Sequence, residues 1–484
     1  MKEIGKIETL FNPDGVVVVG ASTHPGKFGF VALHNIINAE FKGPIFATNP
    51  KRPEILGIQT HAEILEIPKG KANFAMICIS PEKIIATLPQ LSEIGVETAF
   101  VVSGGFKETD SAGENLEKQL VEEAKKWGIL LAGPNGQGLV STPANLCSQI
   151  VSPYPPAGNI SIASQSGNIL SALMNMSRFS NIGVARAIST GNQASLGVSD
   201  YIRYFATDSK TSVIVAYVEG LPNGREFFET IEKSTAKKPV IIIRGGSTKD
   251  GAVAAASHTG SLASDHKVFA GMVKQAGAFL TEGVESAFEL AATFAKQPLP
   301  TGRKTVVMTT AGGWGVLTAD AISKSELSLI ALPDDLKRSI DSLLPPRWSR
   351  GNPIDLAGGE TRDTIPDLLN VLLQHKEVSS LIFLGLGIQG NVARTYYESN
   401  SVTDGMMRMA DFHADQEKRY ANSIIEAITK FGKPVMVASE LAFADSSNPG
   451  PKTLKDGGFL CYRSPSTAVE CLSSLTQYAL ANNS

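Results

Sequence analysis

The chain has 484 residues, of which 43% are hydrophobic and 19% are charged, and its formal net charge is −3. This composition is typical of a soluble globular protein and excludes the disordered and fibrous classes. Because no basic stripe stands out, the sequence gives no electrostatic reason to expect binding to nucleic acid or to an anionic membrane.

The N-terminus and the cysteines favour a cytoplasmic protein. Residues 1–15 lack the apolar core of a signal peptide, and runs such as GVVVVGA fall short of the ~18 apolar residues of a membrane helix. The four cysteines show no CxxC spacing, so we expect reduced thiols. The seven histidines form no ligand cluster such as HExxH, so we expect no metal site built by this chain alone.

Two proline-rich stretches, residues 151–159 and 295–304, divide the chain. We therefore predict three domains, at residues 1–150, 151–298 and 299–484, each of ordinary domain size.

Short apolar runs rich in β-branched residues alternate with helical patterns in every domain, which predicts parallel sheets covered on both faces. The fold class is therefore α/β, with three doubly wound domains in series. In such sheets ligands bind beyond the carboxyl ends of the strands. The predicted strands are residues 15–22, 44–50, 74–80, 98–104, 129–135, 159–167, 212–220, 239–246, 305–313, 380–387 and 434–440.

A glycine-rich turn follows the first predicted strand. Gly20, Gly26 and Gly29 stand between this strand and a helix, where backbone amides can approach a phosphate. The spacing is not GxGxxG, and a tight turn without a ligand is the alternative.

The second predicted strand ends in Asn49, Pro50, Lys51 and Arg52. An NAD site has an acidic residue here, whereas basic residues suit a phosphorylated ribose, as in NADP or coenzyme A (CoA). An ordinary solvated turn is the other interpretation.

The motifs GASTHPGKFG, ATNPKR, VVSGGFKE and LAGPNGQG, in this order, resemble the CoA-binding domain of the NDP-forming acyl-CoA synthetases. This family includes ADP-forming acetate–CoA ligase and is related to succinyl-CoA synthetase. Its members usually carry a cysteine–leucine pair where this chain has Gly136–Gln137, near the thiol end of CoA. The CoA-binding residues that we predict from the resemblance are Gly20, Ser22, Gly26, Lys27, Gly29, Asn49, Lys51, Ser80, Gly104 and Asn135.

The resemblance continues through ASQSGN, STGNQA, YVEGLPNG and AAASHTGSLA, and implies that His258 is transiently phosphorylated. Chemistry supports this role, because an imidazole with a pKa near 6.5 is largely neutral at pH 7 and nucleophilic. The small residues around it leave room for a phosphoryl group. A loop histidine with a structural hydrogen bond is the alternative.

The same motifs suggest groups that serve the phosphohistidine. Glu219 follows a predicted strand, where the family places a glutamate against the histidine to fix its tautomer. The first turn of the helix after Ser166 favours a bound phosphate through its amides and dipole, although Ser166 can also be a simple helix cap. Asn192 matches the asparagine of the family's GN.A pattern, and the resemblance assigns it to the site. The phosphate-binding residues that we predict are Ser164, Ser166, Gly167, Ser257, Thr259 and Gly260.

The third block resembles the family's second flavodoxin-like domain, with Trp314 where proline is usual. Asn352, Pro353 and Asp355 match its NP.D element, for which a structural turn is the alternative. Residues 405–432 predict a helix with a solvated face. The chain shows no GxxxxGK[ST] loop and no segment that resembles ATP-grasp.

The resemblance implies an N-terminal Rossmann-like CoA-binding domain followed by two flavodoxin-like domains, forming the alpha-type subunit of an ADP-forming acyl-CoA synthetase. It implies CoA as cofactor and an acyl phosphate intermediate. Mg²⁺ and ATP or ADP would be bound by a beta-type ATP-grasp partner, in a heterotetramer that acts on a small carboxylic acid. A non-catalytic CoA-binding scaffold and an NADP-dependent oxidoreductase remain as alternatives, and the identity of the acid is left open.

Overall fold

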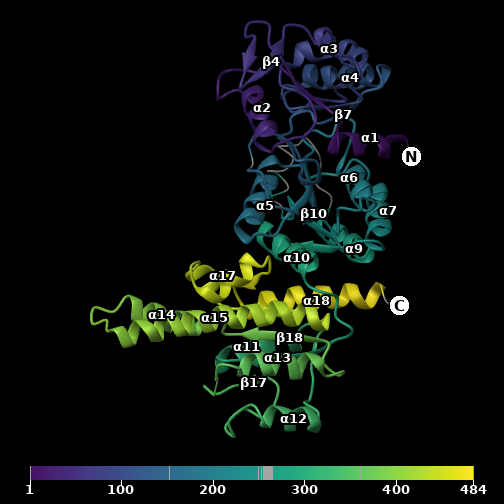
Figure 1. The fold of residues 1–484 in the computed structure, drawn as a ribbon. Helices are drawn as coiled ribbons and strands as arrows, with labels where there is room; N and C mark the ends of the chain where they lie inside the picture. Colours follow the sequence, from purple (N-terminus) through teal and green to yellow (C-terminus); the bar gives the residue numbers. More distant parts are fainter. Residues whose placement is uncertain are drawn as a thin grey trace. The chain divides into compact units, whose positions relative to one another are not determined.

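The computed structural model describes residues 2–151, 153–248, 250–251, 253, 265–359 and 361–482. Two compact units make up the chain, Met1–Ala291 and Ala292–Ser484. In Figure 1 the first unit runs from purple to teal and the second from green to yellow.

Within its described residues, the first unit contains two seven-stranded sheets. The first sheet has the strand order β3-β4-β2-β1-β5-β6-β7, and its neighbours are parallel except for the β3–β4 hairpin. Its strands are β1 (Val16–Val19), β2 (Ile45–Thr48), β3 (Glu54–Ile55), β4 (Ile58–His61), β5 (Phe74–Ile77), β6 (Thr98–Val101) and β7 (Leu130–Ala132).

Helices cover both faces of this sheet, as the apolar runs predict. Val16 and Val18 belong to the core on the side of α1 and α2, whereas Val17 and Val19 belong to the core on the side of α3 and α4. Successive residues of a strand face opposite sides, so a strand buried on both faces is apolar throughout. The helices are α1 (Lys2–Phe11), α2 (Phe28–Asn38), η1 (Ile64–Glu66), α3 (Pro81–Ile94) and α4 (Ser111–Lys126).

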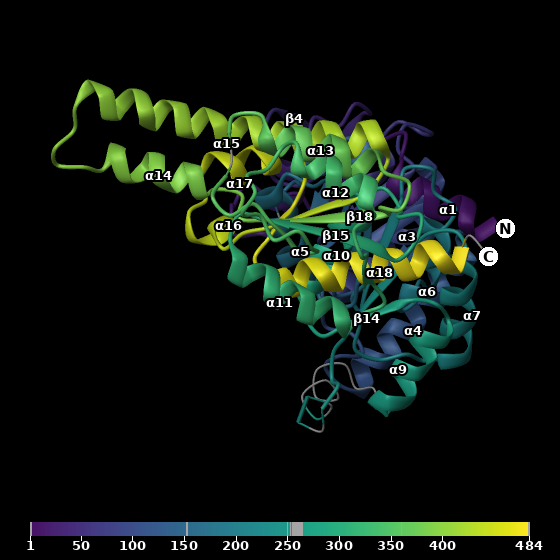
Figure 2. The same cartoon turned by 90° about the horizontal axis from the view of Figure 1, so that it is seen from below.

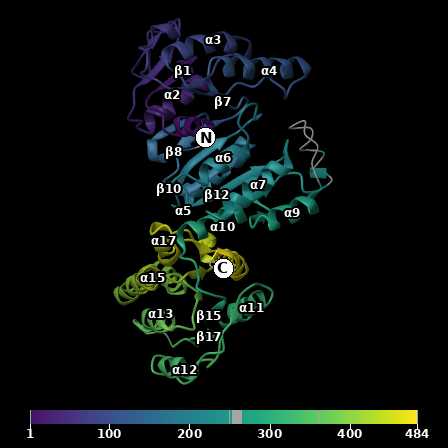
Figure 3. The ribbon, with the colours of Figure 1, turned by 90° about the vertical axis from the view of Figure 1, so that its right-hand side faces the viewer.

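The second sheet has the order β14-β13-β12-β10-β11-β8-β9. Its strands are β8 (Gly138–Ser141), β9 (Leu146–Gln149), β10 (Ala157–Ser164), β11 (Val184–Ser189), β12 (Val213–Val218), β13 (Val240–Arg244) and β14 (Phe279–Thr281). Its helices are η2 (Thr142–Ala144), α5 (Gly167–Ser180), α6 (Val198–Phe205), α7 (Gly224–Thr235), α9 (His266–Gln275) and α10 (Val284–Lys296). Figure 3 shows α7 and α9 side by side along this sheet.

One edge of the second sheet is antiparallel, which the sequence did not predict. β8 pairs with β11, and β9 with β8, both in antiparallel fashion. The two strands are short and carry polar residues, so they lack the apolar signature of the parallel strands. Both strands precede residue 150, so they belong to the second sheet although they lie within the first predicted domain. The limits of the three domains stay a prediction.

The second unit contains a parallel sheet of the order β16-β15-β18-β19-β20, with β17 paired to β15. Counted along the chain without β17, this is the 2-1-3-4-5 order of flavodoxin-like sheets. The strands are β15 (Lys304–Thr309), β16 (Ser328–Leu329), β17 (Ile354–Asp355), β18 (Ser380–Leu384), β19 (Val435–Ala438) and β20 (Cys461–Tyr462).

A long helical hairpin extends from this sheet. α14 and α15 lie side by side along it, as Figure 2 shows. α15 confirms the helix predicted for residues 405–432. The helices of the unit are α11 (Gly312–Ser323), α12 (Asp334–Asp341), α13 (Thr364–Gln374), α14 (Ile388–Tyr397), α15 (Asp404–Phe431), α16 (Leu441–Ala444), α17 (Pro449–Asp456) and α18 (Pro465–Asn482). Among the helices that the structure describes, none has the length and hydropathy needed to cross a bilayer.

Candidate functional site

A pocket of about 680 Å³ in the first unit lies at the carboxyl ends of strands from both of its sheets. Gly104 and Asn135 reach it from the loops after β6 and β7 of the first sheet. Ser166, Gly167 and Glu219 reach it from the loops after β10 and β12 of the second sheet. The pocket therefore brings predicted CoA-binding residues together with predicted phosphate-site residues.

Two loops meet at the floor of the pocket, Gly133–Asn135 of the first sheet and the loop after β11 of the second. The amide of Asn192 donates to the carbonyl of Pro134 at 2.8 Å, and the side-chain amide of Asn135 donates to Asn192 Oδ1 at 3.3 Å. A Cβ on Gly191 would lie 2.1 Å from the oxygen of Pro134, so this approach needs a glycine. The GPN and STGN motifs are therefore parts of one junction.

A network of charged side chains supports this junction. The side-chain amide of Asn192 donates to Glu108 Oε2 at 2.5 Å and to Glu117 Oε2 at 2.8 Å. Lys107 contacts the carbonyl of Asn192 and lies 3.5 Å from Glu117 Oε1. Burial raises the pKa of Glu108, but hydrogen bonds from Asn192 and from the amides of residues 105 and 106 outweigh it and lower the pKa overall. Sequence reasoning missed these roles, although the quoted motif VVSGGFKE contains two of the charges.

Gln165 fixes the backbone at Glu219. Its Oε1 accepts from the amides of Glu219 at 2.5 Å and Gly220 at 3.1 Å, and its Nε2 donates to the carbonyl of Gly220 at 2.8 Å. The Glu219 side chain also hydrogen-bonds the hydroxyl of Tyr217, whose pKa is raised by burial and by the neighbouring carboxylate. Glu219 is 8% exposed, so its carboxylate is held at the pocket wall rather than in open solvent.

The first turn of α5 forms another wall. Ser166 caps the helix, since its Oγ accepts from the amide of Ile169 at 3.4 Å. Ser164 is buried below the turn, where its hydroxyl donates to the carbonyl of Ser166 at 2.6 Å. Gly167 lies against the side chain of Gln137, because an added Cβ would be 2.2 Å from Gln137 Cδ. Ser166 and Gly167 line the pocket, and Ser164 shapes the turn from beneath.

The remaining predicted CoA-binding residues lie elsewhere on the first sheet. At the end of β1, the amide of Gly20 donates to Thr48 Oγ1 at 3.1 Å, and Asn49 Nδ2 donates to the carbonyl of Ala21 at 2.8 Å. Asn49 Oδ1 accepts from the amide of Lys51 at 2.8 Å, which organises the turn after β2. The residues outside the pocket lining are Gly20, Ser22, Gly26, Lys27, Gly29, Asn49, Lys51 and Ser80.

Some of these residues serve the turn itself. Ser22 Oγ accepts from the amide of His24 at 3.0 Å, and the amide of Gly26 donates to His24 Nδ1 at 3.0 Å. Lys27 and Ser80 stand at the starts of α2 and α3 without a side-chain capping hydrogen bond, and both are exposed. Their side chains are therefore available to a ligand above the strand ends.

The predicted catalytic His258 and its neighbours Ser257, Thr259 and Gly260 lie outside the described residues. Among the described residues, the structure brings Glu219 together with Ser166 and Gly167, which are the groups predicted to serve that histidine.

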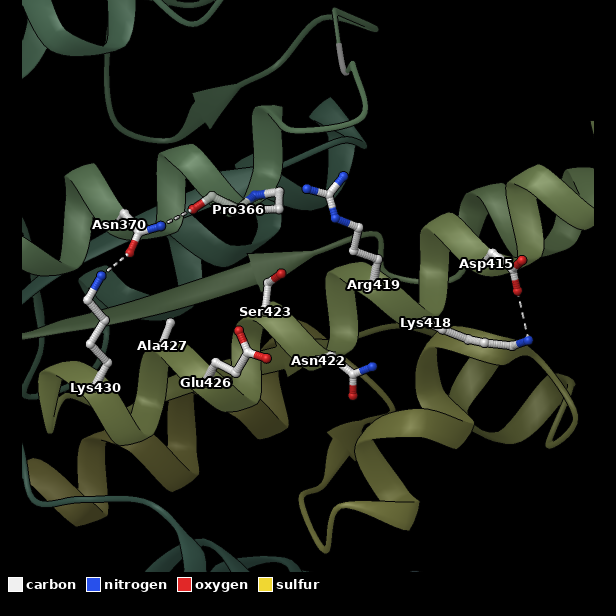
Figure 4. A pocket seen from close by; sticks show the side chains of 10 residues that line it. All are labelled: Pro366, Asn370, Asp415, Lys418, Arg419, Asn422, Ser423, Glu426, Ala427 and Lys430. Atoms are coloured by element: carbon white, nitrogen blue, oxygen red, sulfur yellow. Dashed lines mark hydrogen bonds and ion pairs between the residues drawn. The ribbon is translucent and has the colours of Figure 1, made fainter.

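The second unit has a cavity of about 660 Å³ between α13 and α15 (Figure 4). Its cationic side chains are engaged: Lys418 with Asp415 at 3.0 Å, Lys430 with Asn370 Oδ1 at 2.8 Å, and Arg419 with a backbone carbonyl. Its lining, as far as the structure describes it, contains none of the predicted site residues.

The NP.D element of the second unit acts as a structural turn. Asn352 Oδ1 accepts from the amide of Val307 at 2.9 Å, and its Nδ2 donates to the carbonyl of Thr305 at 2.9 Å. Asp355 Oδ1 accepts from the amide of Ala357 at 2.9 Å. These contacts favour the structural interpretation of the motif.

Three family profiles match successive parts of the chain: "CoA binding domain" over residues 15–141, "Succinyl-CoA ligase like flavodoxin domain" over residues 157–294, and "Ligase-CoA domain" over residues 305–391. The alpha subunit of acetate–CoA ligase [ADP-forming] II from Pyrococcus furiosus is 32% identical over 476 residues, which cover 98% of each chain. Acetate–CoA ligase [ADP-forming] I from Archaeoglobus fulgidus is 33% identical over 379 residues, which cover 78% of this chain and 54% of that protein.

Among solved structures, the dinucleotide forming acetyl-coenzyme A synthetase 1 of Ca. Korarchaeum cryptofilum, in complex with phosphate and ADP, matches with a TM-score of 0.85. Its sequence is 30% identical, and the match covers 99% of this chain and 97% of that one.

Proposed function

This chain belongs to the ADP-forming acetate–CoA ligase family, and on that premise we propose that it is the alpha-type subunit of an enzyme that interconverts acid, CoA and ATP with acyl-CoA, ADP and phosphate. The prediction of the family is confirmed by an alpha subunit that is similar over 98% of both chains. The α/β fold with a CoA-binding domain ahead of flavodoxin-like domains is confirmed as well.

The observation that carries the proposal is the pocket in which two sets of residues meet. Gly104 and Asn135 come from the domain that matches the CoA-binding profile, and Ser166, Gly167 and Glu219 come from the succinyl-CoA ligase like domain. An acyl group that passes between a thiol and a phosphate needs both sets within reach.

In the direction that consumes acyl-CoA, the proposed reaction has two steps on this chain. Phosphate attacks the thioester carbonyl, the C–S bond breaks, and an acyl phosphate forms as CoA leaves. An imidazole nitrogen of His258 then attacks phosphorus, and the P–O bond to the acyl group breaks as the carboxylate leaves. The carboxylate of Glu219 would accept a hydrogen bond from the other ring nitrogen and stabilise the cationic ring. The amides of the first turn of α5 would hold the phosphate.

We further propose an ATP-grasp partner of beta type, which would bind Mg²⁺ and the nucleotide and form a heterotetramer with this chain. The name alpha subunit, carried by the relative that matches the whole chain, implies a second subunit. The Archaeoglobus fulgidus enzyme is about twice as long as the segment that this chain matches, which leaves room for another module in that protein. We place the protein in the cytoplasm, which fits its four free cysteines.

The decisive experiment is phosphoryl labelling of the purified chain. Incubation with radioactive phosphate and a panel of acyl-CoA thioesters, or with labelled acyl phosphates, is expected to label wild type with at least one acyl group and to leave His258→Asn unlabelled. Glu219→Gln keeps the side chain's size but removes its charge, and it should slow labelling by about 100-fold. The same change at the exposed Glu232 of α7 is the matched control and should have no effect.

Two outcomes favour the alternatives. Tight CoA binding without any label on wild type from any acyl group of the panel would indicate a non-catalytic CoA-binding scaffold. Binding of NADPH that is stronger than binding of CoA in a fluorescence titration would indicate an oxidoreductase. Equal labelling of wild type and His258→Asn would contradict the assigned nucleophile.

A further inference from the structure

The side chain of Gln137 lies across the first turn of α5, inside the pocket. Its Nε2 donates to Asn168 Oδ1 at 3.2 Å, and its Oε1 accepts from the hydroxyl of Ser171 at 3.2 Å. Because Gly167 has no side chain, the carboxamide rests directly on the helix. The amide group is therefore held in one orientation from two sides.

The position of Gln137 follows from the path of the chain. It comes two residues after Asn135, at the point where the backbone leaves the first sheet and enters β8 of the second. Its side chain thus lies on the predicted phosphate-binding turn and lines the pocket that also contains Asn135 and Gly104, in which the proposed function places the acyl group. One hydrogen of its Nε2 is used by Asn168, which leaves the other for a ligand in the pocket.

The pocket lining is polar but carries little free positive charge, which suits an acyl group with an uncharged polar substituent. Carboxamides can both donate and accept hydrogen bonds without carrying charge. Lys107 is the only basic residue among the described lining residues, and it is already engaged by Glu117 and by the carbonyl of Asn192. A second carboxylate on the substrate would therefore find no unengaged lysine or arginine in this lining. Six carboxamide residues line the pocket: Asn135, Gln137, Gln165, Asn168, Asn192 and Gln193.

We propose that Gln137 is a specificity-determining residue that favours acyl groups with a hydroxyl or oxo substituent over unsubstituted aliphatic chains of the same length. The inference rests on the proposed function, since it assumes that the pocket receives an acyl thioester. A polar substituent would accept a hydrogen bond from the second N–H of the carboxamide, whereas an aliphatic chain would strip water from this N–H and leave it without a partner.

The test measures binding of three thioesters with the same number of acyl carbons to the full-length chain by titration calorimetry. The probes are 3-hydroxybutyryl-CoA, acetoacetyl-CoA and butyryl-CoA, with free CoA as reference. Wild type is expected to bind at least one substituted thioester about 5- to 10-fold more tightly than butyryl-CoA. Gln137→Met keeps the length of the side chain but removes the amide, and it should bring this ratio to within about twofold while the Kd of free CoA stays unchanged.

The control is Gln119→Met, the same change at an exposed position of α4, which should keep the wild-type ratio. Equal ratios in wild type and Gln137→Met, or a wild type that does not prefer either substituted thioester, would overturn the inference and leave the proposed function intact. Failure of wild type to bind CoA and all three thioesters would overturn the proposed function and the inference together.

Discussion

Gly29 in α2 lies so close to Gly20 after β1 that it does not tolerate a larger residue. A Cβ on Gly29 would lie 2.0 Å from the carbonyl oxygen of Gly20, and Gly20 itself has a φ of +86°. The carbonyl oxygen of Gly20 is backbone, which cannot move aside as a flexible side chain can, and the positive φ of Gly20 strains any residue that has a Cβ. Gly20 and Gly29 of the GASTHPGKFG motif are therefore required by the backbone, whatever ligand lies above them.

We predict that Gly29→Ala destabilises the chain by about 3 kcal/mol, because overpacking against backbone outweighs the better helix propensity of alanine. Gly224→Ala, at the first residue of α7, is the matched control, since an added Cβ there meets nothing within 4 Å. Urea denaturation of both variants measures the free energies of unfolding. Equal stabilities would contradict the close approach.

At this scale the sequence identified some pocket residues and missed others. Ser166, Gly167 and Glu219 were predicted because they belong to motifs that follow strands. Gln165 and Lys107 were not, because their roles depend on partners about 55 and 85 residues away that local pattern does not reveal. Gln137 was noted only as a departure from the family, and its contact with α5 became visible in the structure.

At the level of elements, the start of α14 is bound by a carboxylate from another helix. Glu417 of α15 accepts from the amides of Gly387 at 2.9 Å and Gln389 at 2.7 Å. Glu417 is 2% exposed and lines a cavity of about 190 Å³ beyond β18. Burial raises its pKa to about 7, although the amide hydrogen bonds oppose this shift. An internal carboxylate thus occupies the place that an anionic ligand would take at a helix start.

This carboxylate predicts a dependence of stability on pH. The folded chain binds the proton more tightly than the unfolded chain, whose glutamate has a pKa near 4.5. The contribution of Glu417 to the free energy of unfolding is therefore largest below pH 4.5, falls by about 3 kcal/mol as the pH rises to about 7, and then stays constant. Glu417→Gln should remove this decrease.

Urea denaturation at several pH values between 4.5 and 8 measures the effect. Glu426→Gln, an exposed carboxylate on the same helix, is the control and should follow wild type. The buried thiol of Cys461 does not interfere, because burial raises its pKa to about 12. Parallel pH curves for wild type and Glu417→Gln would contradict the prediction.

Among elements, the apolar parallel strands were the most predictable. All eleven predicted strand segments contain a strand of the structure, because a strand buried on both faces must be apolar along its length. β11, β14, the antiparallel pair β8–β9 and the short strands β3, β4, β16, β17 and β20 were not predicted. That pair mixes leucine, valine and cysteine with glycine, serine and glutamine, and only the neighbouring strand makes these residues part of a sheet.

At the scale of the whole molecule, the pocket belongs to one unit alone. Its lining residues lie between Phe28 and Pro222, and the first unit ends at Ala291. CoA binding should therefore not require the second unit.

We predict that a fragment of residues 1–298, which keeps α10 whole, folds and binds CoA with a Kd within about twofold of that of the full chain. Circular dichroism during heating tests whether the fragment unfolds cooperatively, and titration calorimetry measures the Kd. A fragment that folds but binds CoA more than about tenfold more weakly would show that residues 299–484 contribute to the site.

The sequence by itself determined the family, the α/β class and the positions of the apolar parallel strands, because motifs and hydrophobic periodicity are properties of short segments. Only the tertiary structure decided that the GPN and STGN loops share one junction, that Gln165 holds Glu219, and that Gln137 rests on Gly167. These contacts depend on the order of strands within each sheet and on the passage of the chain from one sheet to the next. The free energy that selects this order comes from packing whole layers together, which no local stretch of residues encodes.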